Sequence, residues 1–257
     1  MNAPEPVHIK QILEEKSLLY NSPDFIIGDP VSVPHLFSKK ENIEVSGFLT
    51  ATIAWGQRKA IISSAVDLIR RMEGDPHDFI INLREADLRV FRGFNHRTFM
   101  EEDCIYFIRA LSHLYKDYGG ISEIFRRSYR ESGSVKSAIM EFRKLFLRWD
   151  PAPRTTKHVA DPGSNSAAKR MNMFLRWMVR RDHRGVDFGI WNFLPMAGLF
   201  LPLDIHTGTI ARSLGILKRK QNDWKAVEEV TAVLRKMDPR DPVRYDFALF
   251  GMGIYEG

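Results

Sequence analysis

Asp204 is the residue of this sequence with the clearest chemical context, because it separates an apolar segment from a short predicted helix. Pro202 does not fit a helix interior, whereas an aspartate is a favoured N-cap. Apolar residues then recur at helical spacing up to Gly215, a typical end of a helix. The pattern predicts a helix over 205–214, whose positive N-terminus favours a carboxylate. Such a carboxylate can stabilise a developing positive charge or assist a nucleophile.

The residues Asp204 and His206 also have side-chain types that bind metals. A metal site is therefore an alternative interpretation of these two residues. It lacks further ligands, because no second histidine and no carboxylate cluster accompanies them. Cys104 is the only cysteine, which excludes an internal disulfide, a cysteine-based zinc site and an iron–sulfur cluster. We therefore predict neither a metal ion nor another cofactor.

The whole stretch 201–215 resembles the catalytic-aspartate segment of the helix-hairpin-helix DNA glycosylases. More narrowly, it is similar to a bacterial family of unknown function related to that superfamily. In the glycosylases this aspartate lies at a helix N-terminus beside the extruded nucleotide. The resemblance implies a DNA N-glycosylase-like protein that removes a damaged base in DNA repair, with Asp204 stabilising the oxocarbenium-like transition state.

Lys169 lies early in a helix predicted over 167–182, for which Asn165 or Ser166 is the predicted N-cap. The archaeal 8-oxoguanine glycosylases are similar in order, with an early helical lysine, a long interval and a proline-rich approach to the aspartate. This similarity implies that Lys169 is a catalytic amine with lyase activity. Lys169 and Asp204 are too distant in sequence for helical adjacency, so only the fold can bring them together.

A glycine-rich hairpin precedes the catalytic aspartate in the glycosylases and binds a phosphate through backbone N–H groups. Gly185 and Gly189 are the candidates for a degenerate form of this hairpin. The usual hairpin lysine is absent, because no lysine lies between His183 and Asp204. This departure leaves open an alternative function, a catalytically inactive module that binds nucleic acid.

Basic residues of the second half of the chain suggest a contact with phosphate groups. In the helix over 167–182, Lys169, Arg176 and Arg180 fall opposite an apolar stripe. This basic face is either simply solvated or placed against a nucleic-acid backbone. The predicted nucleic-acid contacts here are Arg176, Arg180, Gly185, Gly189, His206, Lys218, Arg219 and Lys220.

The region from Glu44 to Met72 is the strongest helical signal of the first half, and Gly56 interrupts it. Glycosylases of the superfamily have a similar apolar helix that ends in one or two glutamines, followed by a loop that places a polar wedge in the duplex. Gln57 occupies the matching place and Arg58 follows it, so both are predicted nucleic-acid contacts. The alternative is an ordinary helix-turn-helix pair in which Gln57 is solvated.

Strand-like alternation is nearly absent, which predicts an all-α class. The spacing of Thr98 and Glu101 predicts a capping box at the start of a long helix over 98–118. Further helices are predicted over 7–20, 78–90, 121–129, 135–149, 223–237 and 245–253.

The predicted architecture is a two-lobed helical bundle similar to the helix-hairpin-helix glycosylases, with a cleft between the lobes. We expect 1–43 to hold an N-terminal helix and an irregular segment that pack with the C-terminal lobe. Residues 44–150 would form one helical lobe, and 151–257 the other, with the degenerate hairpin and the Asp204 helix.

Charge and hydropathy restrict the partners. The net charge is +6 and the pI is about 9.4, which favours a polyanion such as DNA, although the sequence does not distinguish DNA from RNA. No apolar run has the length of a membrane span, and the first residues do not form a signal peptide. We therefore expect a cytoplasmic monomer that binds no membrane.

Overall fold

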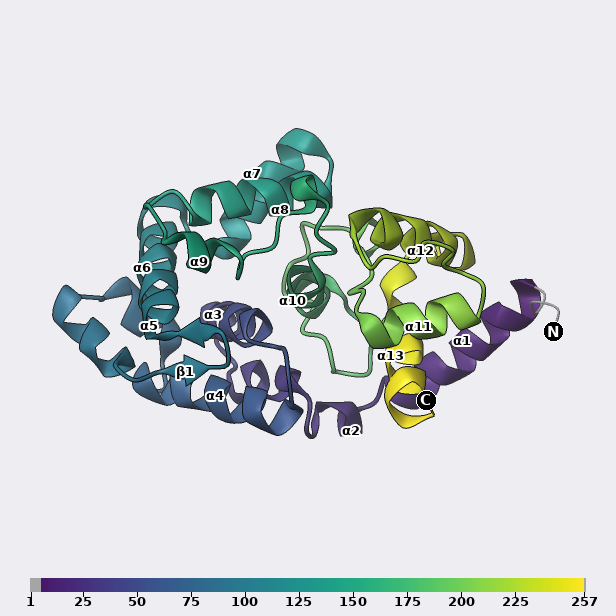
Figure 1. Cartoon of the computed structure of the whole chain (residues 1–257), viewed down its shortest axis with the longest axis horizontal. Helices are drawn as coiled ribbons and strands as arrows, with labels where there is room; N and C mark the ends of the chain where they lie inside the picture. Colours follow the sequence, from purple (N-terminus) through teal and green to yellow (C-terminus); the bar gives the residue numbers. More distant parts are fainter. Residues whose placement is uncertain (1–5, 257) are drawn as a thin grey trace. The chain divides into compact units, whose positions relative to one another are not determined.

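The computed structural model describes residues 6–256, and most of them are helical (Figure 1). This confirms the all-α prediction. The backbone packs into two compact units, one formed by 1–25 together with 161–257 and the other by 26–160. Among the helices of residues 6–256, none has the length and apolar character that crossing a bilayer requires.

The unit formed by 1–25 and 161–257 holds both residues of the predicted Lys169–Asp204 pair. Its main helices are α1 (Pro6–Tyr20), α10 (Lys169–Val179), α11 (Ile205–Ser213), α12 (Trp224–Met237) and α13 (Asp246–Tyr255). The shorter elements are α2 (Pro23–Ile26), whose last residue belongs to the other unit, and the 3-10 helices η4 (Pro162–Ser164), η5 (Met196–Gly198) and η6 (Pro242–Tyr245). Figure 1 shows α13 beside both α1 and α11, and the backbones of these helices are in contact.

Helix α13 approaches α1 closely because it has a glycine where the helices meet. A Cβ atom at Gly251 would lie only 2.1 Å from Cδ2 of Tyr20, and one at Gly253 would lie 3.1 Å from Cβ of His206. The Tyr20 ring of α1 also stacks on the Tyr255 ring of α13, with ring centroids 5.5 Å apart. The first helix of the chain is thus fixed to the last by backbone proximity as well as by aromatic packing.

We expect Gly251→Ala to lower the free energy of unfolding by about 1–3 kcal/mol, because the added methyl group must push the Tyr20 ring away. Gly253→Ala is the matched control, since its Cβ meets a neighbour at 3.1 Å rather than 2.1 Å, and the loss should be smaller. Urea unfolding of both variants measures this difference. Equal losses would show that the Tyr20 contact does not limit the approach of α1 to α13.

The unit formed by 26–160 surrounds a cluster of aromatic side chains. Its main helices are α3 (Lys40–Thr52), α4 (Arg58–Arg71), α5 (Pro76–Ile81), α6 (Glu101–Tyr118), α7 (Ile121–Ser132), α8 (Val135–Phe146) and α9 (Pro153–Thr156). It also holds the 3-10 helices η1 (Pro30–Ser32), η2 (Pro34–Leu36) and η3 (Glu85–Phe91), and an antiparallel hairpin of β1 (Asn95–His96) and β2 (Phe99–Met100). Phe48, Phe107 and Phe146 pack together, with ring centroids 4.7–6.0 Å apart.

The start of α6 corrects one prediction. The predicted capping box of Thr98 and Glu101 is wrong, because the chain forms the small hairpin there and α6 begins at Glu101. The backbone N–H of Met100 instead donates to Asp103 at 2.9 Å. Phe99 explains the difference, since its fully buried ring packs on Phe107 and holds this segment as a strand.

The boundaries of the units lie after residues 25 and 160, whereas the sequence led us to expect changes after residues 43 and 150. The short helices η1 and η2 account for the first difference, because they pack on α4 and α3 of the second unit. Helix α9 accounts for the second, because it packs on α6 of the same unit.

Candidate active site

Asp204 is the N-cap of α11, as the sequence predicted. Its Oδ1 accepts the backbone N–H of Thr207 at 3.0 Å, and its own N–H donates to the Thr207 hydroxyl at 2.8 Å. Gly215, with φ of +72°, follows the helix at the predicted stop. The cap therefore uses one carboxylate oxygen, and the other oxygen remains for a second contact.

Lys169 is the first residue of α10, not the third residue of a longer helix. The predicted N-cap at Asn165 or Ser166 is wrong, because Ala168 precedes the helix in a left-handed conformation with φ of +47°. Asn165 also has a positive φ, of +64°. The segment before α10 therefore turns sharply, and its contacts determine where Lys169 lies.

The fold brings Lys169 and Asp204 together. Lys169 Nζ lies 3.7 Å from Asp204 Oδ2, the oxygen that the cap does not use. The two side chains are 26% and 24% exposed, so a substrate can reach them from solvent. An amine and a carboxylate thus share one partly open site at the N-termini of two helices.

A buried carboxylate lies within electrostatic range of this pair. Asp246, the first residue of α13, accepts a hydrogen bond from Arg176 Nη1. Burial raises the pKa of the Asp246 carboxyl to about 6. The Arg176 and Lys169 cations lower this pKa, whereas the Asp204 carboxylate raises it further. Asp246 was not predicted from the sequence, although an acid among the aromatic and aliphatic residues 245–250 was the available signal.

We expect the titration of Asp246 to appear in the stability of the protein. Between about pH 4 and pH 6 the folded chain holds a proton that the unfolded chain releases, so the free energy of unfolding falls as the pH rises. The Asp246→Asn side chain cannot titrate. Its free energy of unfolding should therefore rise by about 2–3 kcal/mol relative to that of the parent as the pH increases over this range. Urea unfolding of both proteins at several pH values measures the gain, and parallel curves would contradict it.

Arg176 and Arg180 share a helix face with Lys169, but the prediction that this face is an exposed basic stripe is wrong for both arginines. They are only 4% and 2% exposed. Asp187 lies between them, 3.2 Å from Arg176 Nε and 3.1 Å from Arg180 Nη1. Because buried guanidinium groups need charged partners, this face packs against acids of later segments.

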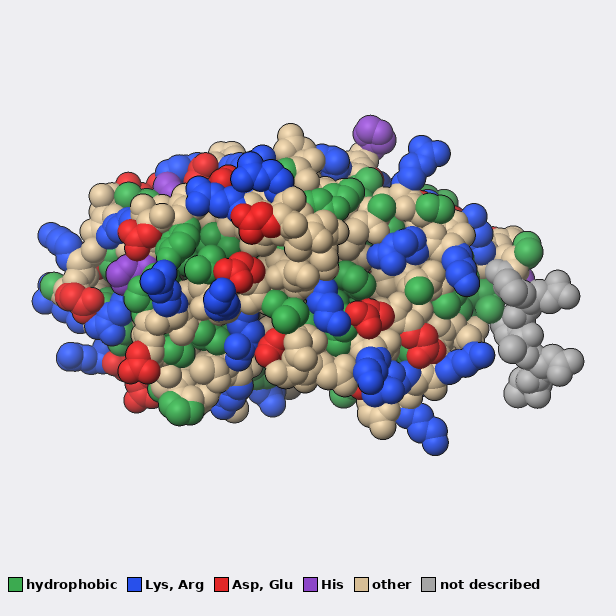
Figure 2. Space-filling view, turned by 90° about the horizontal axis from the view of Figure 1, so that it is seen from above, with side chains coloured by type: hydrophobic (Ala, Val, Ile, Leu, Met, Phe, Trp, Pro, Cys, Tyr) green, Lys and Arg blue, Asp and Glu red, His purple; other side chains and the backbone are tan. Residues whose placement is uncertain are grey.

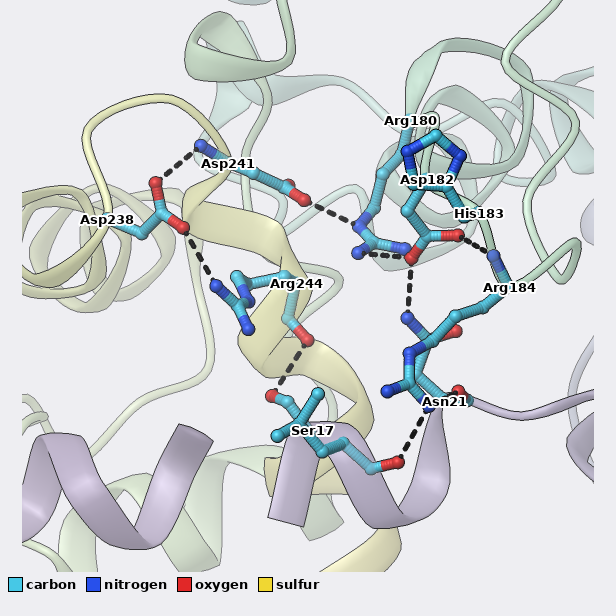
Figure 3. Close-up of a pocket in the computed structure, with 10 residues that line it drawn as sticks. Ser17, Asn21, Arg180, Asp182, His183, Arg184, Asp238, Asp241 and Arg244 are labelled. Carbon is cyan, nitrogen blue, oxygen red and sulfur yellow. Dashed lines mark hydrogen bonds and ion pairs between the residues drawn. The ribbon is translucent and has the colours of Figure 1, made fainter. Parts of the chain in front are cut away.

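Arg180 also borders a cavity of about 320 Å³ (Figure 3). The close-up shows Arg180 between Asp241 and Asp182, with ion-pair distances of 2.9 Å and 2.8 Å. The residues that line the cavity are Ser17, Leu18, Asn21, Arg180, Asp182, His183, Arg184, Asp238, Asp241 and Arg244. Lys169 and Asp204 are not among them, so this cavity is separate from the candidate active site.

The segment with Gly185 and Gly189 does not form a hairpin between two consecutive helices. After α10 ends at Val179, the described chain holds only the short η5 before α11 begins at Ile205. The N–H of Gly189 donates to the Trp177 carbonyl at 3.4 Å, and a phosphate contact at Gly189 stays a prediction. Gly185 is exposed, with φ of +76°.

The remaining predicted contacts of this unit differ in exposure. His206, Lys218 and Lys220 are exposed. Arg219 is half-buried and forms an ion pair with Asp223. The first three side chains therefore stay available for the predicted contact with nucleic acid.

Gln57 and Arg58 lie at the turn between α3 and α4 in the other unit. Gln57 is exposed and occupies the N-cap position of α4 without a side-chain capping bond. Arg58 is the first residue of that helix and is half-buried. Gly56 has φ of +101°, and a Cβ there would lie 2.7 Å from Nη1 of Arg97. The turn is thus tight, and Gln57 stays a predicted nucleic-acid contact.

Two further side chains, which were not predicted as part of the site, support the backbone of Asp204 by hydrogen bonds. The Asn222 Nδ2 group donates to the Asp204 carbonyl at 2.8 Å, and Arg212 Nη2 donates to Asn222 Oδ1. Arg212 belongs to the motif that carried the resemblance, but no local signal linked Asn222 to it. Among the described residues, no group of three or more His, Cys, Asp or Glu side chains is placed to hold a metal ion.

Residues 29–255 match the model of the family described as protein of unknown function DUF2400. The chain belongs to this family. The matched region includes Lys169, Asp204 and Asp246, so the whole candidate site lies inside the family domain. Comparisons with curated proteins and with solved structures found no match.

Proposed function

We propose that this DUF2400 protein is a DNA N-glycosylase with lyase activity that acts on a damaged base. The observation that carries the proposal is the 3.7 Å separation of Lys169 Nζ and Asp204 Oδ2 in a partly exposed site. A nucleophilic amine beside an oriented carboxylate is the arrangement that covalent removal of a base requires.

In the proposed reaction, the neutral Lys169 amine attacks C1′ of the extruded nucleotide. A C1′–N bond forms while the glycosidic bond breaks, and the base leaves with the bonding electron pair and takes up a proton. Asp204 stabilises the positive charge that builds on the sugar in the transition state. It is also the carboxylate placed to accept the proton that Lys169 must lose before it attacks. Transfer of this proton to the departing base restores the carboxylate charge.

The charge of the chain supports a polyanionic substrate. The net charge is +6, and Lys218 and Lys220 are exposed in the same unit as the candidate site. Basic and acidic side chains are mixed on the face that Figure 2 shows. This mixture favours a few local phosphate contacts over a continuous basic surface, together with extrusion of the target nucleotide into the site.

Trapping with sodium borohydride on a duplex with one abasic site tests the proposal. The amine condenses with the sugar aldehyde to an imine and releases water, and borohydride then reduces the imine to a stable secondary amine. We expect a covalent protein–DNA adduct that requires borohydride, and base release from at least one member of a panel of damaged duplexes.

Absence of both the adduct and base release would contradict the proposed activity. Binding that still weakens with salt would then favour the inactive nucleic-acid-binding module. For duplex DNA the logarithm of the binding constant falls with that of the salt concentration by about 0.9 for each phosphate contact.

A further inference from the structure

Asn222 and Asp223 precede α12 and contact both chain segments that carry the candidate catalytic pair. We infer that these two residues form a bracket that fixes the separation between Lys169 Nζ and Asp204 Oδ2. The inference rests on the proposed function, in which Lys169 and Asp204 touch the substrate and the bracket residues act only through them. Asn222 and Asp223 are therefore positioning residues.

Asn222 forms the arm that holds Asp204. Its Nδ2 donates to the Asp204 carbonyl at 2.8 Å, while its Oδ1 accepts from Arg212 Nη2. Arg212 is itself oriented, since its Nε donates to the Arg219 carbonyl at 2.8 Å. These bonds fix which end of the Asn222 amide faces Asp204, because an oxygen in the Nδ2 position could not donate.

Gly208 allows the Asn222 amide to pack on the first turns of α11. A Cβ atom at Gly208 would lie 2.7 Å from Asn222 Oδ1 and 3.1 Å from its Nδ2. Any larger side chain would displace the amide. The backbone that carries Asp204 is therefore held from outside its own helix, in addition to its capping bonds.

Asp223 forms the arm that holds the approach to Lys169. Its Oδ2 accepts from Asn165 Nδ2 at 3.0 Å, and the backbone of the next residue, Trp224, donates to the Asn165 carbonyl at 3.1 Å. A backbone bridge pairs Ser166 with Asp223. Arg219 donates to both carboxylate oxygens, which fixes the orientation of the Asp223 side chain.

The approach to Lys169 needs such support because its backbone is strained. Ala168 has φ of +47° directly before α10, and Asn165 has φ of +64°. Left-handed conformations are costly for residues other than glycine and persist where surrounding contacts impose them. Without the Asp223 arm, the first turn of α10 would relax and Lys169 would move relative to Asp204.

An ordinary role as the cap of α12 is the alternative for Asp223, because its Oδ1 also accepts the Ala226 N–H at 3.1 Å. Serine is an equally good N-cap residue, but its side chain is too short to reach Asn165 and Arg219. Asp223→Ser therefore keeps the cap and removes the bracket. Asp223→Asn keeps the cap through its single amide oxygen but places an NH2 group at the Oδ2 position, which cannot accept from Asn165. It is therefore a second variant that keeps the cap and removes the bracket.

The experiment compares Asn222→Ala, Asp223→Ser and Asp223→Asn with the parent, and uses the exposed neighbour in Gln221→Ala as the matched control. The readouts are the single-turnover rate of borohydride trapping on the abasic duplex, the Kd for that duplex and the Tm. We expect all three variants to trap about 10- to 100-fold more slowly with Kd unchanged, because small displacements of reacting groups carry such losses. Gln221→Ala should trap like the parent.

Parental trapping rates for Asn222→Ala, Asp223→Ser and Asp223→Asn would overturn the bracket. If the parent itself forms no adduct, the proposed function fails, and crystal structures of the same variants then decide. A Lys169–Asp204 separation longer than the parental 3.7 Å supports the bracket, and an unchanged separation overturns it.

Discussion

Lys169→Gln is expected to abolish the covalent adduct with abasic DNA and to leave the fold intact. An amide nitrogen is not a nucleophile, so no imine forms, and removal of a catalytic nucleophile lowers rates by about 10³-fold or more. The side chain is 26% exposed at the first residue of α10. Its replacement should therefore change the free energy of unfolding by only about 0.5 kcal/mol.

The control for Lys169 is the same change at Lys225, which is exposed on α12 of the same unit. Lys225→Gln should trap at the parental rate. Peptide mapping of the parental adduct adds a direct measurement, because the modified lysine carries the mass of the reduced sugar. An adduct on another lysine, or parental trapping by Lys169→Gln, would remove Lys169 from the mechanism.

The part of the site that local sequence determines was predictable. Pro202, Asp204 and Gly215 predict the start and the end of α11, because capping depends on hydrogen bonds within one helical turn and on backbone preferences of single residues. The structure places the cap on Asp204 as expected, and the group it caps is the Thr207 N–H. The same rule predicts Asn222 or Asp223 as the cap of α12, and the structure places the cap on Asp223.

The partners of Arg176 and Arg180 could not be predicted from periodicity. The helical repeat predicts that both side chains lie opposite the apolar stripe. It does not show what covers that face, and the covering acids, Asp187, Asp241 and Asp246, come from three later segments of the chain. A basic helix face therefore has two possible environments, solvent or buried carboxylates, and only tertiary packing decides between them.

The start of α10 shows the same limit. Asn165 and Ser166 are good N-cap residues by type, yet the helix begins only at Lys169. Asn165 is bound instead to Asp223 and Trp224, so contacts with a distant segment override the local preference. The proximity of Lys169 and Asp204 was implied only by a resemblance in the order of residues, and the distance itself required the fold.

Asp204→Asn is expected to keep the stability of the protein and to lose base release by about 10²- to 10³-fold. Asparagine is a good N-cap residue, so its side-chain oxygen can still accept the Thr207 N–H that Oδ1 accepts in the parent. The change falls on Oδ2, which faces Lys169 at 3.7 Å. A neutral amide there cannot stabilise a developing cation or accept the proton of the ammonium group.

Asp204→Ala separates the two roles of the residue. It removes the cap as well as the charge, so the free energy of unfolding should fall by about 0.5–2 kcal/mol in addition to the loss of base release. Asp75→Ala is the matched control, because Asp75 caps α5 through the Asp78 N–H at 3.0 Å in the other unit. It should lose a similar amount of stability and no activity.

Single-turnover excision across a panel of damaged duplexes, with thermal melts of the same samples, measures both effects. Loss of activity in Asp204→Asn without loss of stability assigns the carboxylate charge to the chemical step, because the capping oxygen is retained. Equal duplex affinity for parent and variant would place the loss after binding. If Asp204→Asn excises as fast as the parent, Asp204 is only a helix cap, and the 3.7 Å contact with Lys169 is a surface ion pair worth about 1 kcal/mol or less.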